Sequence, residues 1–288
     1  MKIVEFTLEQ GNKYFGRVDD GERFFIGSRV PFDGGKGLMN IKGTPDQRYN
    51  RQEFRGTHGF WADFIHPTAM AEGALYHTLN TYDRARFTFS FLQYAAHVPN
   101  GDFVVYFRAL LKLPLAVEYF HDLTLKNNRI TRVTDNGTTQ LESDTSTEGL
   151  MDYLNPSRSE VEDTEVVQAA KFVHWAQNDP AHRQTQIDIG ISHFKANMVS
   201  YANRYDLDGA LDSICLVVAD IRHQGRAKSP AIVTALNSSK PLESLLAIGE
   251  SKYPDRIATL RREIKKLTEE GTLGTHVYNL AQRDFVAH

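Results

Sequence analysis

The chain of 288 residues is long enough for one large domain or two small ones. Hydrophobic residues make up 41% of it and charged residues 24%, which argues against disordered and fibrous proteins. The net charge of −3 argues against a nucleic-acid binder, and the single cysteine, Cys215, excludes an internal disulfide framework. We therefore expect a globular protein without covalent cross-links and without a nucleic-acid partner.

The first residues bear on where the protein is made. Polar and charged residues occur within the first five positions, and no apolar signal core or cleavage pattern follows. The longest apolar run, residues 214–219, is far too short to span a bilayer. We expect synthesis in the cytoplasm without a standard signal peptide, and no insertion into a membrane.

The first 55 residues favour β-hairpins followed by a loop. Apolar residues alternate over 1–30, and Gly11 and Gly21 lie in turn signals between the expected strands. Residues 31–55 are rich in Gly, Asp, Asn and Arg without clear periodicity, so we expect a long loop. A Gly-Gly-Lys-Gly sequence at 34–37 lacks the spacing and the Ser/Thr of a phosphate-binding loop, and we interpret it as part of that loop.

The next part of the chain, up to residue 158, predicts short elements of both kinds. Pro67 suits the first turn of a helix. Aromatic residues alternate with small polar ones over 86–94, which indicates a short strand or an extended loop. The expected elements are a helix over about 67–80, a helix over about 102–112, a hairpin over 129–143 and a polar linker over 144–158.

From residue 160 onward the hydrophobic pattern is helical, with breaks at residues such as Pro180, Gly225 and Pro254. The expected helices cover about 160–178, 180–204, 208–224, 229–237, 241–250 and 254–270. The sequence thus predicts an α+β protein that is mainly α-helical and carries small β-hairpins.

Two carboxyl groups have contrasting sequence surroundings. Glu72 lies in an apolar helical segment, where burial would raise its pKa toward the range of a general acid. Asp83 lies in a polar turn beside Arg84, which favours the charged form. Hydrolysis of a glycosidic bond needs such a pair. By residue type alone, a solvated Glu and an ordinary turn Asp explain the same pattern.

Residues 68–102 resemble the lysozyme-like superfamily, in particular goose-type lysozymes, chitosanases and phage or secreted muramidases. The resemblance rests on Asn80-Thr-Tyr-Asp83, Phe89-Ser-Phe-Leu-Gln93 and Ala95-Ala96-His97. It implies a two-lobed helical body with small β-hairpins. The implied divisions are an N-terminal β-hairpin extension over 1–57 and a lysozyme-like domain over 58–288, with a lobe boundary near 144–158.

The resemblance also implies roles for single residues. Glu72 would be the general acid, and Asp83 or Asp102 would activate water or stabilise the oxocarbenium-like state. The sugar chain would be bound by Tyr82, Ser90, Gln93 and His97. The sequence departs from the family pattern at Leu92, where the family has Gly, and at Gly73, where Ser is frequent.

A second element, residues 211–225, resembles the helix that chitosanase-like enzymes place against the cleft. Asp220, His223 and Gln224 would emerge at its cleft end and bind substrate. A core helix that ends at Gly225 explains the same residues equally well.

We expect neither a metal nor a cofactor. The 11 histidines form no His-Glu-x-x-His pair, and Cys215 lies in an apolar segment typical of an inert core residue. Nucleophilic serine motifs of the Gly-x-Ser-x-Gly type are missing from the sequence.

These features predict a bacteriolytic glycoside hydrolase that cleaves β-1,4 bonds of an amino-sugar polymer, with peptidoglycan as first and chitosan as second choice. The alternative is an inactive lysozyme-like relative, a structural or carbohydrate-binding component of a phage tail or secretion apparatus. A third interpretation is a helical interaction protein whose resemblance is accidental. Expected partners are the polysaccharide and an immunity or secretion-apparatus protein. The enzyme would reach the periplasm or cell wall through lysis or injection.

Overall fold

The computed structural model describes residues 1–41 and 47–288. The chain forms two compact units, each made of two stretches of sequence. The first unit comprises residues 1–48 and 73–189, and the second comprises 49–72 and 190–288. Residues 144–158, where a lobe boundary was expected, lie inside the first unit. Among the described residues, no helix is both long and apolar enough to cross a membrane.

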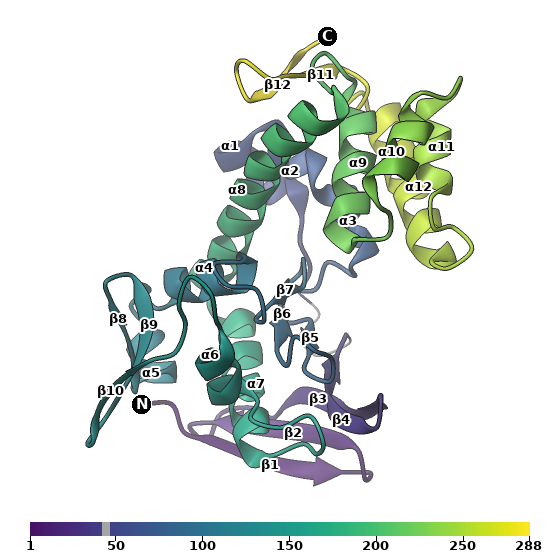
Figure 1. Ribbon diagram of the computed structural model, residues 1–288. Coiled ribbons are helices and arrows are strands. Elements are labelled where there is room, and N and C mark those ends of the chain that lie inside the picture. Colours follow the sequence, from purple (N-terminus) through teal and green to yellow (C-terminus); the bar gives the residue numbers. More distant parts are fainter. Residues whose placement is uncertain (42–46) are drawn as a thin grey trace. The chain divides into compact units, whose positions relative to one another are not determined.

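The first unit contains a seven-stranded antiparallel sheet in which each strand pairs with the next one along the chain (Figure 1). Tyr14, Phe24 and Ile26 on its inner face are buried. The helix α7 (Asp163–Asn178) packs against its first three strands. The strands are β1 (Val4–Glu9), β2 (Lys13–Val18), β3 (Phe24–Phe32), β4 (Gly35–Asn40), β5 (Leu79–Asn80), β6 (Thr88–Phe89) and β7 (Tyr94–Ala95).

The structure corrects the prediction of a loop over residues 31–55. Strand β4 and helix α1 (Arg51–His58) both fall within that range, while residues 42–46 lie outside the described residues. Strand β4 shows no alternating hydrophobic pattern, because it has glycines at positions 35 and 37. At these positions the backbone of another segment of the chain comes close. A Cβ atom built on Gly37 would lie 2.7 Å from the backbone N and Cα of Tyr82. The close approach of the Tyr82 backbone, and not a turn, explains why residue 37 is a glycine.

Gly37→Ala is therefore expected to destabilise the protein by about 1–3 kcal/mol, because the added methyl group forces the Tyr82 backbone aside. Urea denaturation measures the change. Gly56→Ala in α1 is the matched control, since a Cβ there meets nothing within 4 Å. We expect the control to be neutral or slightly stabilising. Equal effects at the two positions would contradict this account of Gly37.

The rest of the first unit has an aromatic core. The ring of Phe172 on α7 lies 5.1–5.8 Å from the rings of Phe87, Phe89, Phe103, Phe107 and Phe120. The surrounding elements are α4 (Asp102–Leu110), α5 (Ala116–Tyr119), β8 (Leu123–Lys126), β9 (Arg129–Thr134), β10 (Gly137–Gln140) and α6 (Glu148–Leu154). The predicted helix over 102–112 and the hairpin over 129–143 are confirmed.

The polar linker predicted over 144–158 is wrong. Residues Glu148–Leu154 form α6, and its Leu150 and Leu154 are fully buried. The two leucines are four residues apart, which is one helical turn, but the surrounding Ser, Thr and Asp residues mask this short pattern.

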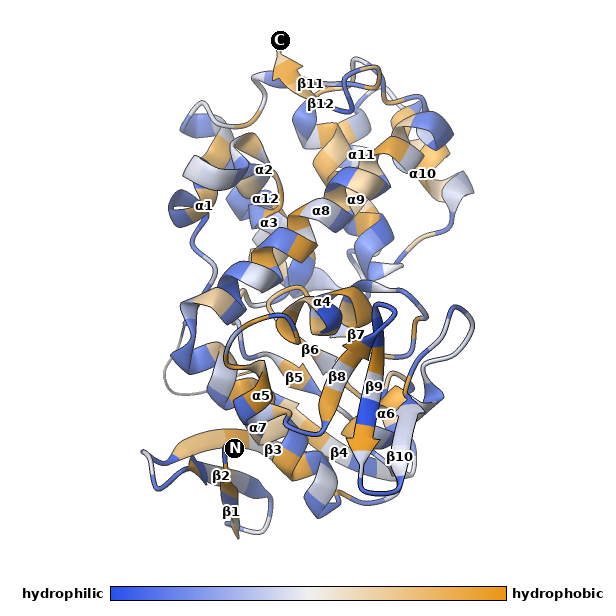
Figure 2. Cartoon of the chain, turned by 90° about the vertical axis from the view of Figure 1, so that its left-hand side faces the viewer, coloured by the Kyte–Doolittle hydropathy of each residue, from blue (hydrophilic) through white to orange (hydrophobic). Residues whose placement is uncertain are grey.

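The second unit is helical apart from one hairpin, and its helices carry both hydrophobic and hydrophilic residues (Figure 2). Its helices begin and end close to the predicted positions after residue 190, whereas the C-terminal hairpin was not predicted. The elements are α1, α2 (Phe60–Phe64), α3 (His66–Ala71), the C-terminal part of α8 (Pro180–Tyr205), α9 (Asp212–Gln224), α10 (Ser229–Leu236), α11 (Pro241–Ala247), α12 (Pro254–Glu269), β11 (His276–Asn279) and β12 (Asp284–Ala287).

Helix α3 is shorter than the helix predicted over 67–80. It ends at Ala71, and Gly73 and Ala74 then adopt φ angles of 92° and 60°. This left-handed backbone cannot continue an α-helix, although Ala74 and Leu75 extend the apolar pattern. The consequence is that Glu72 occupies the end of a helix and not its middle.

Candidate functional site

Glu72 is the C-cap residue of α3, and its side chain is 12% exposed. Its Oε1 accepts a hydrogen bond from Nη1 of Arg256 on α12. Nε2 of His223 on α9 lies 3.9 Å from the same oxygen. Glu72 therefore faces charged and polar groups, whereas the sequence predicted apolar surroundings.

Arg256 is held in place by a second carboxylate. Its Nη2 donates to Oδ1 of Asp220 at 2.6 Å, and Arg226 donates to Oδ2 of the same carboxylate. Asp220 has no exposed surface. Burial opposes the charge of Asp220, but Arg256 and Arg226 outweigh burial and hold its pKa below the ordinary value. Asp220 thus anchors two guanidinium groups, and the structure does not support its predicted contact with substrate.

The other two residues predicted on this helix join the same cluster. Oε1 of Gln224 accepts a hydrogen bond of 3.3 Å from Nη1 of Arg226. The ring of His223 lies 5.5 Å from the ring of Phe194. We call Glu72, Asp220, His223, Gln224, Arg226 and Arg256 the Glu72 cluster.

Sequence reasoning missed the two arginines of the Glu72 cluster. Arg226 directly follows the predicted helix end at Gly225, so the sequence could have indicated that it lies near Asp220. The sequence did not indicate that Arg256 lies there, because this residue belongs to a charged amphipathic helix typical of a surface. Burial lowers the pKa of Arg226, with Asp220 opposing the shift. Burial also opposes the charge of Arg256, but Asp220 and Glu72 together raise its pKa.

In the first unit, Asp83 lies in a tight turn between β5 and β6. Its Oδ1 accepts a hydrogen bond of 2.8 Å from the backbone N–H of Ala85. Its Oδ2 accepts one of 3.1 Å from the side-chain amide of Asn80, whose own oxygen accepts from the N–H of Tyr82. Asp83 is therefore a hydrogen-bonded carboxylate in a polar turn, as the sequence predicted.

Tyr82 and His97 lie within electrostatic reach of Asp83. Burial raises the pKa of Tyr82, and Asp83 adds to the shift. Burial lowers the pKa of His97, Arg84 adds to this, and Asp83 opposes it. The structure thus brings three predicted residues of the first unit together, namely Tyr82, Asp83 and His97.

Ser90 and Gln93 shape the turn between β6 and β7. Both have left-handed backbone, with φ angles of 98° and 55°. Ser90 is fully buried and its Oγ accepts from the N–H of Leu92, so the structure does not support a sugar contact by Ser90. Leu92, where the family has Gly, is 1% exposed and fills the core. Left-handed backbone at non-glycine residues costs energy and is concentrated at functional sites.

Asp102 begins α4 directly after its N-cap residue Gly101. A carboxylate in the first turn interacts favourably with the helix dipole, which explains Asp102 without catalysis. The structure therefore gives Asp102 a local role at the start of α4.

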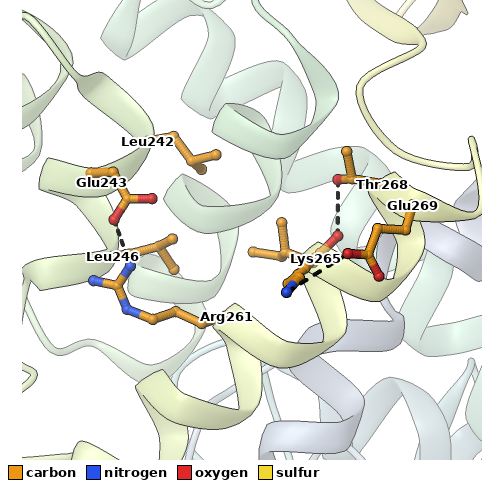
Figure 3. Close-up of a pocket in the computed structure, with 8 residues that line it drawn as sticks. Leu242, Glu243, Leu246, Arg261, Lys265, Thr268 and Glu269 are labelled. Carbon is orange, nitrogen blue, oxygen red and sulfur yellow. Dashed lines mark hydrogen bonds and ion pairs between the residues drawn. The ribbon is translucent and has the colours of Figure 1, made fainter.

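Two of the surface hollows are lined by none of the residues of the Glu72 cluster. One, of about 390 Å³, lies between α11 and α12, where Leu242, Leu246 and Ile264 are flanked by the ion pairs Glu243–Arg261 and Lys265–Glu269 (Figure 3). The other, of about 210 Å³, is lined by Tyr82, Phe32 and the segment 158–159, with the two rings 5.1 Å apart. Of these two hollows, only the second is lined by a predicted site residue, Tyr82.

No group of three His, Cys, Asp or Glu residues in the described part of the chain is placed to hold a metal.

Comparisons with models of known protein families, with curated proteins and with solved structures found no match to this chain.

Proposed function

We propose that the protein is a glycoside hydrolase that cleaves β-1,4 bonds of an amino-sugar polymer, with peptidoglycan as the substrate. Glu72 protonates the leaving oxygen, and Asp83 stabilises the oxocarbenium-like state or activates water. The proposal includes the lysozyme-like fold that the sequence resemblance implies.

The observation that carries this proposal is the organisation of charge around Glu72. Two guanidinium groups and two carboxylates lie in the Glu72 cluster, where Asp220 is fully buried and Arg256 is 8% exposed. Burying charged groups costs more than an apolar core of the same volume, so stability alone does not account for the cluster. Orientation of the Glu72 carboxyl by Arg256 does account for it, because a general acid must be held toward the bond it protonates.

Asp83 suits the second role. A carboxylate held in a fixed direction can stabilise a positively charged transition state that forms beside it. Both oxygens of Asp83 accept hydrogen bonds within its turn, and these bonds fix the direction of the carboxylate. This supports Asp83 over Asp102 as the second carboxylate.

One observation favours the alternative function of an inactive, polymer-binding relative. Oε1 of Glu72 accepts a hydrogen bond from Arg256, whereas a general acid must donate one to the leaving oxygen. The Arg256–Glu72 pair therefore suits a protein that binds a polysaccharide without cleaving it, as a structural or carbohydrate-binding component of a phage tail or secretion apparatus.

Incubation of the purified full chain with peptidoglycan sacculi, and separately with chitosan, distinguishes the two functions. The hydrolase proposal predicts new reducing ends and soluble fragments from one of these polymers. Binding to sacculi in a pull-down without any new reducing ends supports the alternative. If the protein neither binds nor cleaves either polymer, both proposed functions are overturned.

The two candidate second carboxylates are separated by matched substitutions. Asp83→Asn is expected to lower the rate of cleavage about 100-fold, since the amide keeps only one of the two hydrogen bonds of the turn and cannot stabilise positive charge. Asp102→Asn is expected to change the rate less than about threefold and to weaken only the start of α4. Initial rates of reducing-end release measure both. The reverse order of effects would assign the role to Asp102.

A further inference from the structure

Beneath the turn that carries Asp83 lies a buried carboxyl group, Glu165. It belongs to the first turn of α7, has no exposed surface, and is not among the residues that the sequence indicated. Its Oε1 accepts a hydrogen bond from Oγ1 of Thr81 and another, of 3.1 Å, from the backbone N–H of Leu38 on β4. Glu165 therefore joins three elements of the first unit: α7, β4 and the Asp83 turn.

Thr81 connects Glu165 and β4 to the turn, because it bonds to both and directly precedes Tyr82. Its hydroxyl also accepts a hydrogen bond of 2.6 Å from the N–H of Leu38, and its own N–H donates to the Leu38 carbonyl at 3.0 Å. The side-chain amide of Asn155 donates to the carbonyls of Thr81 and Arg86, at 3.0 and 2.9 Å. Asn155 thus holds both ends of the segment 81–86, which contains Asp83, and Glu165 holds the Thr81 end as well.

Of these two supports, only Glu165 can change its charge. Burial raises its pKa to about 7, and the bonds from Thr81 and Leu38 and the backbone N–H of Glu162 oppose this shift. The charge of Glu162 at the start of α7 raises the pKa of Glu165, and Glu165 in turn helps to raise the pKa of Tyr14 on β2, where burial is the main cause. The neutral and charged forms of Glu165 therefore both occur near neutral pH.

We propose that Glu165 is a positioning residue that holds the Asp83 turn through Thr81, and that the hold depends on whether Glu165 carries a proton. The effect on catalysis rests on the proposed function, in which Asp83 takes part in glycoside cleavage. The effect on the turn itself does not.

The direction of the effect follows from the two protonation states. A carboxyl group whose pKa rises on folding binds its proton more tightly in the closed, buried state than in the open, hydrated one. Its stabilising contribution is complete below about pH 4.5, the ordinary value, and is lost as the pH rises to about 7. The turn should therefore open more readily at neutral pH than in mild acid.

Amide hydrogen exchange of residues 80–86 in the full chain, corrected for the intrinsic pH dependence, measures this opening. We expect the opening constant to rise on the order of 100-fold between about pH 4.5 and about 7 in the wild type. Glu165→Gln should remove this dependence, because the amide cannot titrate. Gln also suits this position of a helix N-terminus, so the start of α7 is preserved.

Glu162→Gln is the matched control. It removes an exposed carboxylate from the same helix start and leaves the Thr81 contact intact. It should keep the pH-dependent opening, with the end of the transition at slightly lower pH because a negative neighbour is lost. A pH dependence in Glu165→Gln equal to that of the wild type would overturn the proposal.

A second pair of variants tests the route through Thr81. Thr81→Ser keeps the hydroxyl and should retain the wild-type transition. Thr81→Val removes a donor that lowers the pKa of Glu165, so the end of its transition should move to higher pH. A transition in Thr81→Val at the same pH as in the wild type would overturn the role of Thr81.

The activity measurement is separate. If the wild type cleaves peptidoglycan, Glu165→Gln should hold the turn as the protonated form does, so kcat should lose the wild-type change between about pH 5 and 7, and KM should change less. A profile of kcat against pH equal to that of the wild type would overturn the catalytic part of the proposal. If the wild type cleaves no polymer, the proposed function fails, and hydrogen exchange alone decides whether Glu165 holds the turn.

Discussion

Glu72→Gln is expected to lower the rate of peptidoglycan cleavage by about 10²–10⁴-fold, the contribution typical of a general acid. Glutamine keeps the size of the side chain and can accept from Arg256, but it has no proton to give to the leaving oxygen. Reducing-end release from sacculi, measured with the wild type and the variant at equal concentration, gives the ratio.

The control for this variant is Glu269→Gln near the end of α12, where the carboxylate is exposed and makes only a loose pair with Lys265 at 3.7 Å. It should cleave at the wild-type rate. Circular dichroism and the denaturation midpoint of Glu72→Gln show whether the fold is intact. A folded Glu72→Gln protein as active as the wild type would remove Glu72 from the mechanism, whatever the substrate.

Asp220→Ala is expected to destabilise the protein by about 3–5 kcal/mol, because it removes the carboxylate that neutralises two buried guanidinium groups. The side chain of Arg226 is fully buried and that of Arg256 is 8% exposed, so neither can regain its hydration without moving. Urea denaturation of the full chain, followed by the far-ultraviolet signal of the helices, measures the loss.

Glu243→Ala is the matched control for Asp220→Ala. It removes the carboxylate of an exposed pair, in which Arg261 is 36% and Glu243 is 60% exposed. Water and salt screen such a pair, and its loss should cost less than about 1 kcal/mol. Should Asp220→Ala cost no more than this control, the buried network would not contribute to stability in the way described. A loss of activity in Asp220→Ala at a temperature where the fold persists would support orientation of Glu72 through Arg256.

The Asp83 turn and the Glu72 cluster differ in how far the sequence predicts them. The turn is local: Asn80, Asp83 and Ala85 bond to one another within six residues, so their spacing alone indicates the structure. The Glu72 cluster joins α3, α9 and α12, and its partner Arg256 is 184 residues from Glu72. Only the packing of helices brings such distant residues together, and a single sequence carries no record of it.

The helical half of the protein was predictable because its helices, like the Asp83 turn, depend on residues that are close in the sequence. Hydrophobic periodicity over 160–270 reports which residues face a core, and the helices observed there begin and end near the expected positions. Strand β4 and helix α6 were missed because glycine in one case and surrounding polar residues in the other mask short patterns. Glu165 was missed because its sequence context is that of an exposed helix start, and only its fully buried position reveals it.

By itself, the sequence determined the α+β class, the N-terminal hairpins, most of the helices and the polar surroundings of Asp83. Each of these depends on neighbouring residues or on periodicity along the chain. The tertiary structure alone decided that Glu72 faces a guanidinium rather than apolar side chains, that Asp220 is buried, and that Glu165 supports the Asp83 turn. The charge state of a carboxyl group depends on burial and on the nearest charges in space, which are settled only when the chain has folded.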